Sequence, residues 1–429
     1  MNKINIGLIG YGVVGQGVVK WLKGRKSFLQ NKFQTNFVLK TICDRSIHKK
    51  NTRGLGTTKL TKNINDILND KSIDVVIELI GGLNPAKKIV VRALKNGKHV
   101  ITANKALIAN DGKELFALAN QYSTRLYFES AVGAGIPIIK TLSEGTAGNK
   151  FKSLYGIING TCNFILDEMT NNHCSFEEAL KDAQKRGYAE SDPTLDINGK
   201  DSAHKLAILV YLAFGKFLNV NDIYCEGISQ ISHVDIEHAE SLDLKIKLLA
   251  IAKKEGNAIE ARVHPTLIPK EHPLSAIHGI FNALYLEADP LGDVLLSGEG
   301  AGQMAAASGV ISDLITLASQ GSGGRNLSNL HSEAKNVTTR KIDQILTRFY
   351  VRFMAVDKPG ALSKITGLLG QYGVGINSVT QKAHTHAATV PVIMLTDDTS
   401  EKSLRAALNK IQKLPIIKGK PVAIRMEEV

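Results

Sequence analysis

Short apolar runs alternate with amphipathic segments along the first third of the chain. Strand-like runs occupy residues 4–10, 37–43, 74–80, 98–103 and 125–130. Helical periods fill the intervals between them, at 13–22, 84–96 and 112–122. The runs are apolar almost throughout, as strands buried on both faces of a parallel sheet must be. The alternation predicts βαβ units and a doubly wound α/β domain.

The pattern changes near residue 131. Ser175 with Glu178 three residues later predicts a helix that starts with a capping box and ends at Gly187. A polar loop then leads to a long helix from Asp201 to about Phe214, and residues 258–300 contain several strand-like runs. This mixture predicts an α+β second domain.

Residues 320–344 are polar and rich in Gly, Ser and Asn, which is typical of a linker. Beyond them the order β-α-β-β-α-β predicts a ferredoxin-like domain. The expected division is therefore a dinucleotide-binding type domain at 1–130, completed by part of 300–320, a second domain at 131–319, the linker, and a small domain at 345–429.

Composition and charge narrow the class of protein. Of 429 residues, 43% are hydrophobic and 22% charged, so a sizeable core can form. The apolar runs are too short to span a membrane, which favours a cytoplasmic protein. A net charge of +13 suggests nucleic acid, but the basic residues are spread out and only 6% of residues are aromatic. Four cysteines without metal-like spacing indicate incidental thiols.

A glycine-rich turn directly follows the first strand. Gly10, Gly12 and Gly15 enclose Tyr11, Val13 and Val14 in the pattern GxGxxG and open a helix. Glycines let the backbone approach a pyrophosphate, and the helix N-terminus offers it free N–H groups. We therefore expect NAD or NADP here. Asp44 and Arg45 end the second strand; Asp favours NAD and Arg favours NADP, so the choice stays open.

Lysines and carboxylates supply the candidate chemistry. Lys105 follows the fourth strand, at the edge where such sheets bind ligands. Asp201 and Lys205 are spaced i, i+4 on one helix face. Hydride transfer to a carbonyl needs an acid for the developing alkoxide, and a lysine held by an aspartate suits that role. The carboxylates Glu190, Asp192, Asp196 and Asp201 suit a substrate bearing an ammonium group.

Six motifs run through the chain: GLIGYGVVGQGV (7–18), VITANKALIA (100–109), ESAVGAGIPII (129–139), GIINGTCNFIL (156–166), GYAESDPTLDINGKDSAHKLAIL (187–209) and GEGAGQMAAASGVISDL (298–314). With them the chain resembles monofunctional homoserine dehydrogenases with a C-terminal ACT domain. The resemblance implies a Rossmann-type domain, a catalytic and dimerisation domain, and NAD(P)-dependent interconversion of L-aspartate 4-semialdehyde and L-homoserine in threonine, methionine and isoleucine biosynthesis.

The resemblance also implies roles for individual residues. Lys205 corresponds to the catalytic acid/base, Asp201 to its partner and Lys105 to an assisting lysine near the nicotinamide. Glu190 and Asp196 correspond to substrate-binding residues. A sodium site is implied by the set Glu129, Val132, Ala134 and Ile136. The ACT domain implies feedback by an amino acid such as threonine, and a homodimer or homotetramer.

Some positions depart from the family pattern, namely Cys162, Glu299 and Ala305–Ala307. These substitutions are expected to affect the local geometry of loops and not the reaction. Two other functions compete with the main hypothesis. A different Rossmann-type semialdehyde reductase would lack the 187–209 block, and a non-catalytic ACT amino-acid sensor would lack Lys105 or Lys205.

Overall fold

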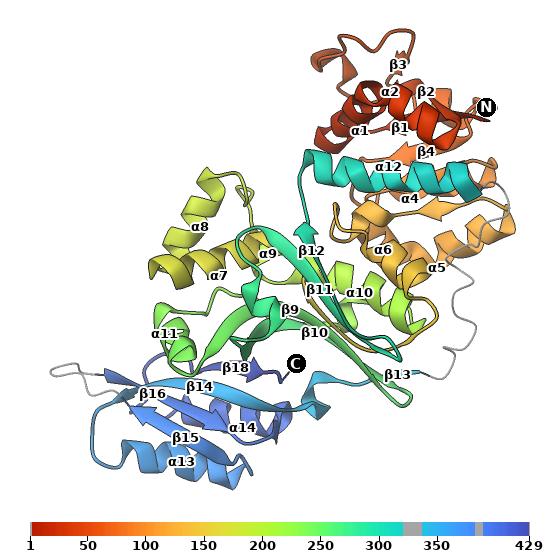
Figure 1. The fold of residues 1–429 in the computed structure, drawn as a ribbon. Coiled ribbons are helices and arrows are strands. Elements are labelled where there is room, and N and C mark those ends of the chain that lie inside the picture. The colour runs from red at the N-terminus through yellow and green to blue at the C-terminus, as the bar shows by residue number, and fades with distance from the viewer. Residues whose placement is uncertain (1, 321–336, 382–388, 429) are drawn as a thin grey trace. The chain divides into compact units, whose positions relative to one another are not determined.

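The computed structural model describes residues 2–320, 337–381 and 389–428 (Figure 1). Most of the expected linker, 321–336, lies outside the described residues. The chain divides into two compact units. The first contains Met1–Leu154, Ser202–Ile223 and Phe281–Val337, and the second contains Tyr155–Asp201, Tyr224–Ile280 and Thr338–Val429. In the described part of the chain, no helix is both long enough and apolar enough to cross a membrane.

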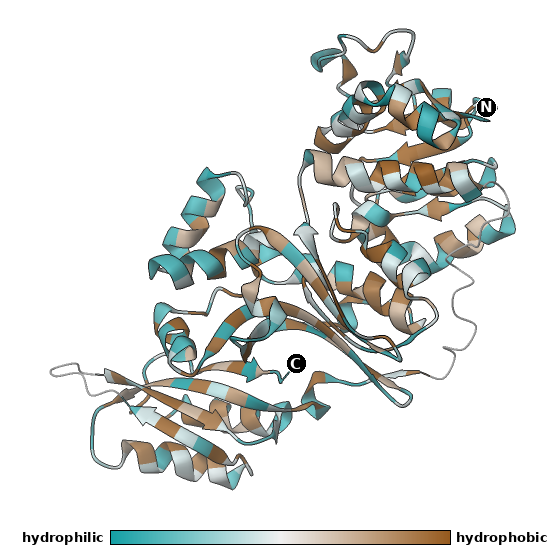
Figure 2. Ribbon diagram, viewed as in Figure 1, coloured by the Kyte–Doolittle hydropathy of each residue, from teal (hydrophilic) through white to brown (hydrophobic). Residues whose placement is uncertain are grey.

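A six-stranded parallel sheet forms the centre of the first unit, in the order β3-β2-β1-β4-β5-β6. Its strands are β1 (Asn2–Ile9), β2 (Thr35–Cys43), β3 (Lys59–Thr61), β4 (Val75–Glu78), β5 (His99–Thr102) and β6 (Leu126–Tyr127). All four residues of β4 are buried, and these strands are mostly brown in Figure 2. The predicted doubly wound sheet is confirmed, apart from the short exposed β3, which has no apolar run to reveal it.

Helices cover this sheet, and one of them, α12 (Gln303–Gln320), comes from a part of the chain that is distant in sequence. They are α1 (Val13–Gly24), α2 (Lys26–Phe33), α3 (Asn65–Leu68), α4 (Ala86–Lys95), α5 (Lys105–Gln121) and α12. α12 packs against α1, where a Cβ on Gly17 would come within 2.7 Å of the Gln303 carbonyl oxygen. A helix predicted at 112–122 begins instead at Lys105, because Asn104 caps it by accepting from the Leu107 N–H.

The first unit also holds the short helix α6 (Ile138–Lys140) and an antiparallel hairpin of β11 (Phe281–Asp289) and β12 (Gly292–Glu299). Two elements continue from one unit into the other, namely β7 (Lys150–Ile157) and α10 (Lys200–Phe214). α10 is almost entirely buried, and Asp201 and Lys205 lie one turn apart on it.

The second unit is built on a mixed sheet in which β9, β10, β18, β14, β16 and β15 are neighbours in that order. The bounds of these strands are Leu244–Glu255, Ala258–Pro269, Val422–Met426, Leu346–Val356, Thr389–Thr396 and Ile376–Gln381. Short strands β8 (Tyr224–Cys225), β13 (Thr338–Thr339) and β17 (Thr399–Ser400) pair at its margins. Thr266 of β10 pairs with Arg425 of β18, so the C-terminal sheet continues the sheet of the preceding domain.

Helices of the second unit are α7 (Gly160–Asn172), α8 (Phe176–Lys185), α9 (Thr194–Ile197), α11 (His233–Ser241), α13 (Ala361–Gln371) and α14 (Glu401–Ile411). The capping box of α8 is confirmed, because Ser175 and Glu178 exchange hydrogen bonds. β14, α13, β15, β16, α14 and β18 follow one another as predicted and enclose their own core around Phe349, Val351 and Phe353. The predicted α+β and ferredoxin-like architectures are both present.

Candidate active site

The glycine-rich turn joins β1 to α1. Gly10 has a φ of +99°, and a Cβ there would come within 2.7 Å of the Leu79 backbone. A Cβ on Gly15 would lie 2.2 Å from the Gly10 carbonyl oxygen, so the helix can approach the strand only without one. Gly12, at the N-cap of α1, faces open space. The first and third glycines are therefore required by the fold, and the second leaves room for a ligand beside Val13 and Val14.

A cleft of about 390 Å³ opens beside this turn. Gly10 and Gly12 line it together with residues that follow β2 and β3, among them Asp44, Arg45, Lys50 and Lys62. The cleft lies at the carboxyl ends of the strands, where β1 has neighbours on both sides and the strand order reverses. This is where doubly wound sheets bind dinucleotides.

Asp44 is the most constrained of the cleft's charged residues. Its Oδ2 accepts from the Tyr11 N–H at 2.8 Å and from the Lys50 ammonium at 2.6 Å, while Oδ1 accepts from Ser46. Partial burial would raise the pKa of Asp44, but the bonds from Lys50, Ser46 and Tyr11 outweigh it and hold the pKa well below its usual range. Asp44 therefore stays ionised and fixes the glycine-rich turn. Arg45 and Lys62 are exposed.

Lys105 is the first residue of α5 and follows the buried strand β5. Asn104 holds the turn before it by donating its side-chain amide to the Gly82 carbonyl oxygen at 2.6 Å. Beneath this turn, Thr102 donates to the buried carboxylate of Glu78 at 2.6 Å. These bonds place Lys105 at the same edge of the sheet as the glycine-rich turn. The sequence patterns gave no role to Asn104, which lies beside Lys105 in the motif VITANKALIA, or to Glu78, which lies in an apolar strand-like run.

Asp201 and Lys205 are both buried on α10, with 6% and 8% of their surfaces exposed. The side-chain amide of Asn159 donates to Asp201 Oδ2 at 3.0 Å and to Asp196 Oδ1 at 2.8 Å. Asn159 also caps α7 by accepting from the Cys162 N–H. One amide thus brings together two of the predicted carboxylates, a role that the sequence patterns did not reveal.

Glu190 is placed differently from these two carboxylates. Its side chain is exposed, and its backbone carbonyl oxygen accepts from Gln184 at 3.2 Å. At the Cys162 departure, the thiol contacts the Asp196 carbonyl oxygen at 3.2 Å and so bonds to the loop that carries Asp196. Ala307 lies in the contact of α12 with α1, 3.2 Å from where a Gly17 Cβ would be, so a small residue suits that position.

Glu129 lies after β6 and is 2% exposed. Its carboxylate accepts from the backbone N–H groups of Ile139 at 2.9 Å and Lys140 at 3.0 Å. Burial raises the pKa of Glu129 to about 7, although Lys140 and these N–H groups lower it. The pKa of the fully buried Asp313, which accepts from the Glu129 N–H, is also raised by burial and by Glu129. Two buried carboxylates side by side favour an added positive charge.

The backbone beside Glu129 turns tightly. Gly133 and Ala134 have positive φ values of 66° and 26°, and the Ile136 N–H donates to the Gly133 carbonyl oxygen at 2.7 Å. Carboxylate oxygens are the kind of ligand that a hard cation prefers, and Glu129 is the residue here that could supply them. Among the described residues, no cluster of three or more His, Cys, Asp or Glu side chains could hold a metal ion.

Comparisons with known proteins match all three parts of the chain. The family models "Homoserine dehydrogenase, NAD binding domain", "Homoserine dehydrogenase" and "ACT domain" match residues 10–129, 137–315 and 349–416. A homoserine dehydrogenase of Neisseria gonorrhoeae is 40% identical over 100% of both chains, and that of Bacillus subtilis is 36% identical over 100% of this chain and 99% of the relative.

The chain belongs to the homoserine dehydrogenase family.

Solved structures agree with this assignment. A homoserine dehydrogenase from Thiobacillus denitrificans has a TM-score of 0.93 at 39% identity, over 100% of this chain and 99% of that chain. A hyperthermophilic archaeal homoserine dehydrogenase in complex with NADPH has a TM-score of 0.64 at 26% identity, over 76% of this chain and 99% of that chain. Like its family, the protein is an NAD(P)-dependent oxidoreductase acting on a CH–OH group. The resemblance inferred from the six motifs is confirmed.

Proposed function

We propose that the protein interconverts L-homoserine and L-aspartate 4-semialdehyde, with Lys205 as the catalytic acid/base. The observation that supports this most directly is on α10: Lys205 is buried one turn after a buried carboxylate, Asp201, which Asn159 holds in place. A lysine in such a setting can take the proton of an alcohol or return it to an alkoxide. Asp201 is a positioning residue for it.

In the oxidation, the hydroxyl proton of homoserine passes to Lys205 while the C4 hydride leaves and the aldehyde forms; the reduction reverses both transfers. When bound, the nicotinamide ring supplies the hydride acceptor or donor. Lys105, at the N-terminus of α5, adds positive charge near the developing oxyanion. Glu190 and Asp196 bind the substrate ammonium group. Asp196 is already fixed by Asn159, whereas the exposed Glu190 is available to the substrate.

A substrate series tests this proposal against a different semialdehyde reductase. L-Homoserine, L-serine, which is one carbon shorter, and 4-hydroxybutyrate, which lacks the ammonium group, are compared as substrates with NAD and NADP, following reduced nicotinamide. We expect efficient oxidation of homoserine alone. Equal turnover of 4-hydroxybutyrate would contradict the role of the carboxylates, and no turnover of homoserine with either cofactor would contradict the proposed reaction.

We propose that NADP(H) is the preferred cofactor. Gly10, Gly12 and Gly15, with the backbone of Val13 and Val14, form the pyrophosphate turn. Asp44 is engaged by Lys50 and by the Tyr11 N–H, so gripping a ribose 2′-hydroxyl would compete with an existing ion pair. Arg45 and Lys62 add exposed positive charge to the same cleft, which suits a 2′-phosphate.

We further propose a sodium ion bound by Glu129 and the backbone oxygens of Val132, Ala134 and Ile136. The raised pKa of Glu129 beside Asp313 supports it, because a bound cation would relieve the repulsion between the two carboxylates. The ion has a structural role in this proposal and takes no part in the transfer of hydride or proton.

Regulation and assembly complete the proposal. An amino acid such as threonine acts as effector at the ACT domain. The enzyme serves the biosynthesis of threonine, methionine and isoleucine. It works as a homodimer or homotetramer. The functional domains are those expected from the sequence, 1–130 with part of 300–320, 131–319 and 345–429. Adding L-threonine to the homoserine assay tests the effector, and light scattering tests the assembly.

A further inference from the structure

Asp235 is a fully buried carboxylate that the reaction does not use. It lies in the first turn of α11, where its Oδ2 accepts from the backbone N–H and the hydroxyl of Ser232 at 2.9 and 2.8 Å. Two further residues reach it from the ACT strand β14. Arg352 bonds both oxygens, at 2.6 and 3.0 Å, and the Tyr350 hydroxyl donates to Oδ1 at 3.0 Å. Five hydrogen bonds therefore hold one buried charge.

The two faces of β14 contact different parts of the protein. Side chains alternate along a strand, so Tyr350 and Arg352 share one face, and Phe349, Val351 and Phe353 form the ACT core on the other. Burial and the neighbouring Asp235 raise the pKa of the Tyr350 hydroxyl, which keeps its proton for the bond. Two residues on one face of this ACT strand thus hold a helix of the catalytic domain.

α11 connects this contact to α7. It packs against α7 and β9, and the ring of His233 at its start meets that of His173 at the end of α7, edge to face at 5.6 Å. The opposite end of α7 is capped by Asn159, which holds Asp196 and Asp201. A helix of 13 residues is about 20 Å long, and its backbone hydrogen bonds make it stiff along that length. One end of α7 is therefore linked to the ACT domain and the other to the substrate carboxylates.

We propose that Asp235 is a positioning residue for the substrate: through it, Tyr350 and Arg352 of the ACT domain set the position of α11 and α7, and so the grip of Asn159 on Asp196 and Asp201. The inference rests on the proposed function and extends it, because it assigns the ACT domain a part in substrate binding without any effector.

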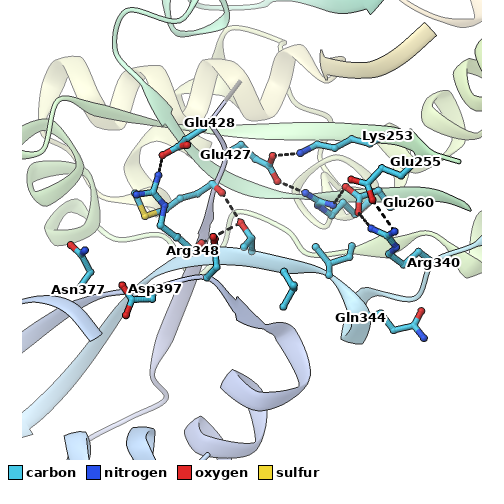
Figure 3. Close-up of a pocket in the computed structure, with 16 residues that line it drawn as sticks. Lys253, Glu255, Glu260, Arg340, Gln344, Arg348, Asn377, Asp397, Glu427 and Glu428 are labelled. Atoms are coloured by element: carbon cyan, nitrogen blue, oxygen red, sulfur yellow. Dashed lines mark hydrogen bonds and ion pairs between the residues drawn. The ribbon is translucent and has the colours of Figure 1, made fainter. Parts of the chain in front are cut away.

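A second contact of the same strand provides a control. A cleft of about 1200 Å³ is lined by residues of β9, β10 and the start of β14. Figure 3 shows the side chains that line it. Its four cations, Lys253, Arg262, Arg340 and Arg348, are all paired with glutamates of the cleft itself. Arg348 pairs there with the exposed Glu428, away from α11. Exposed pairs of this kind contribute little, so losing Arg348 should not move α7.

Steady-state kinetics of the full-length protein test the proposal. For Arg352→Met we expect a rise of about tenfold in the KM for homoserine, with the KM for NADP unchanged within about twofold. Arg352→Lys, which keeps the charge, should recover part of the loss, and Arg348→Gln should match the wild type. A folded Arg352→Met protein with wild-type KM values, or with both KM values raised alike, would overturn the proposal.

Tyr350→Phe covers the case in which Arg352→Met does not fold, because it removes one bond and keeps the ring. It should raise the KM for homoserine about threefold, and an unchanged value would also overturn the proposal. The proposed function and the role of Asp235 are tested separately. A wild-type protein that does not oxidise homoserine contradicts the proposed function, whereas normal wild-type turnover with unaffected variants contradicts only the role of Asp235.

Discussion

Asn159 donates its side-chain amide to Asp201 across 3.0 Å, and the same nitrogen lies 2.8 Å from Asp196. The carboxylate that precedes the candidate acid/base and the one assigned to the substrate are therefore held by a single neutral group. Without it, two neighbouring carboxylates would repel each other and separate. Replacing Asn159 thus tests the geometry of the site without removing any charge.

Asn159→Ala should raise the KM for homoserine at least tenfold and lower kcat as well, because both carboxylates lose their common donor. It should also cost about 1 kcal/mol of stability through the lost cap of α7. Ser175→Ala is the matched control, since it removes the exposed cap of α8. If both variants lose stability but neither changes KM, Asn159 is only a helix cap.

Arg45→Ala and Lys62→Ala should each lower kcat/KM for NADP about tenfold and leave kcat/KM for NAD within about twofold, because each removes a charge facing a 2′-phosphate. Lys49→Ala is the control, being exposed in the same segment but outside the cleft lining. Equal losses with both cofactors would mean that these residues do not discriminate between them.

The proposed sodium site predicts a pH-dependent stabilisation. The pKa of Glu129 in the folded protein, about 7, lies above its ordinary value of 4.5. The folded state therefore binds the extra proton between these values, and stability falls as pH rises through about 7. A cation offsets that loss, so replacing choline chloride with sodium chloride should raise Tm more at about pH 8 than at about pH 5.5.

Glu129→Gln should abolish this sodium-specific difference, and Glu177→Gln, at an exposed carboxylate of α8, should keep it. A sodium effect of the same size in Glu129→Gln would show that the ion, if bound, is held elsewhere.

Lys247 is a buried ammonium on β9 that contacts Asn163 Oδ1 at 3.0 Å and the Ile277 carbonyl oxygen at 2.6 Å. Burial lowers its pKa from 10.5 to about 8. The unfolded chain then holds more protons between these values, so stability rises with pH across that window, by up to about 3 kcal/mol. Urea unfolding of wild type and Lys247→Met at about pH 7.5 and 9.5 checks this.

The gain on raising the pH should be smaller in Lys247→Met than in the wild type, and Lys254→Met, at a less buried lysine of the same strand, should behave as the wild type. Equal gains in the stability of all three proteins would mean that burying the charged form of Lys247 does not destabilise the folded state.

The local pattern of apolar and polar residues was sufficient to predict those elements in which burial follows a regular repeat along the chain. β4 is four consecutive buried residues, and the start of α8 is determined by Ser175 and Glu178 alone. The predicted start of α5, at residue 112, is too late, because the pattern of apolar residues does not reveal Asn104 as its cap. The residues of the glycine-rich turn were also recognisable, since strand, glycines and helix follow one another directly.

Contacts between distant residues could not be predicted in this way. The bonds of Asn159 reach 37 and 42 residues along the chain, and those of Asp235 reach 115 and 117. The pairing of Thr266 with Arg425 joins two domains whose sequences each describe a separate sheet. Such contacts depend on how elements pack, and no periodicity within one element encodes them.

We propose that Lys205 transfers the proton in the oxidation of homoserine. The most direct measurement compares wild type and Lys205→Met for reduced nicotinamide formed from L-homoserine and NADP, with NADPH binding measured on the same samples by fluorescence. We predict that Lys205→Met loses at least a thousandfold in kcat while its affinity for NADPH changes by less than about twofold. Turnover by Lys205→Met within about tenfold of the wild type would show that Lys205 does not transfer the proton.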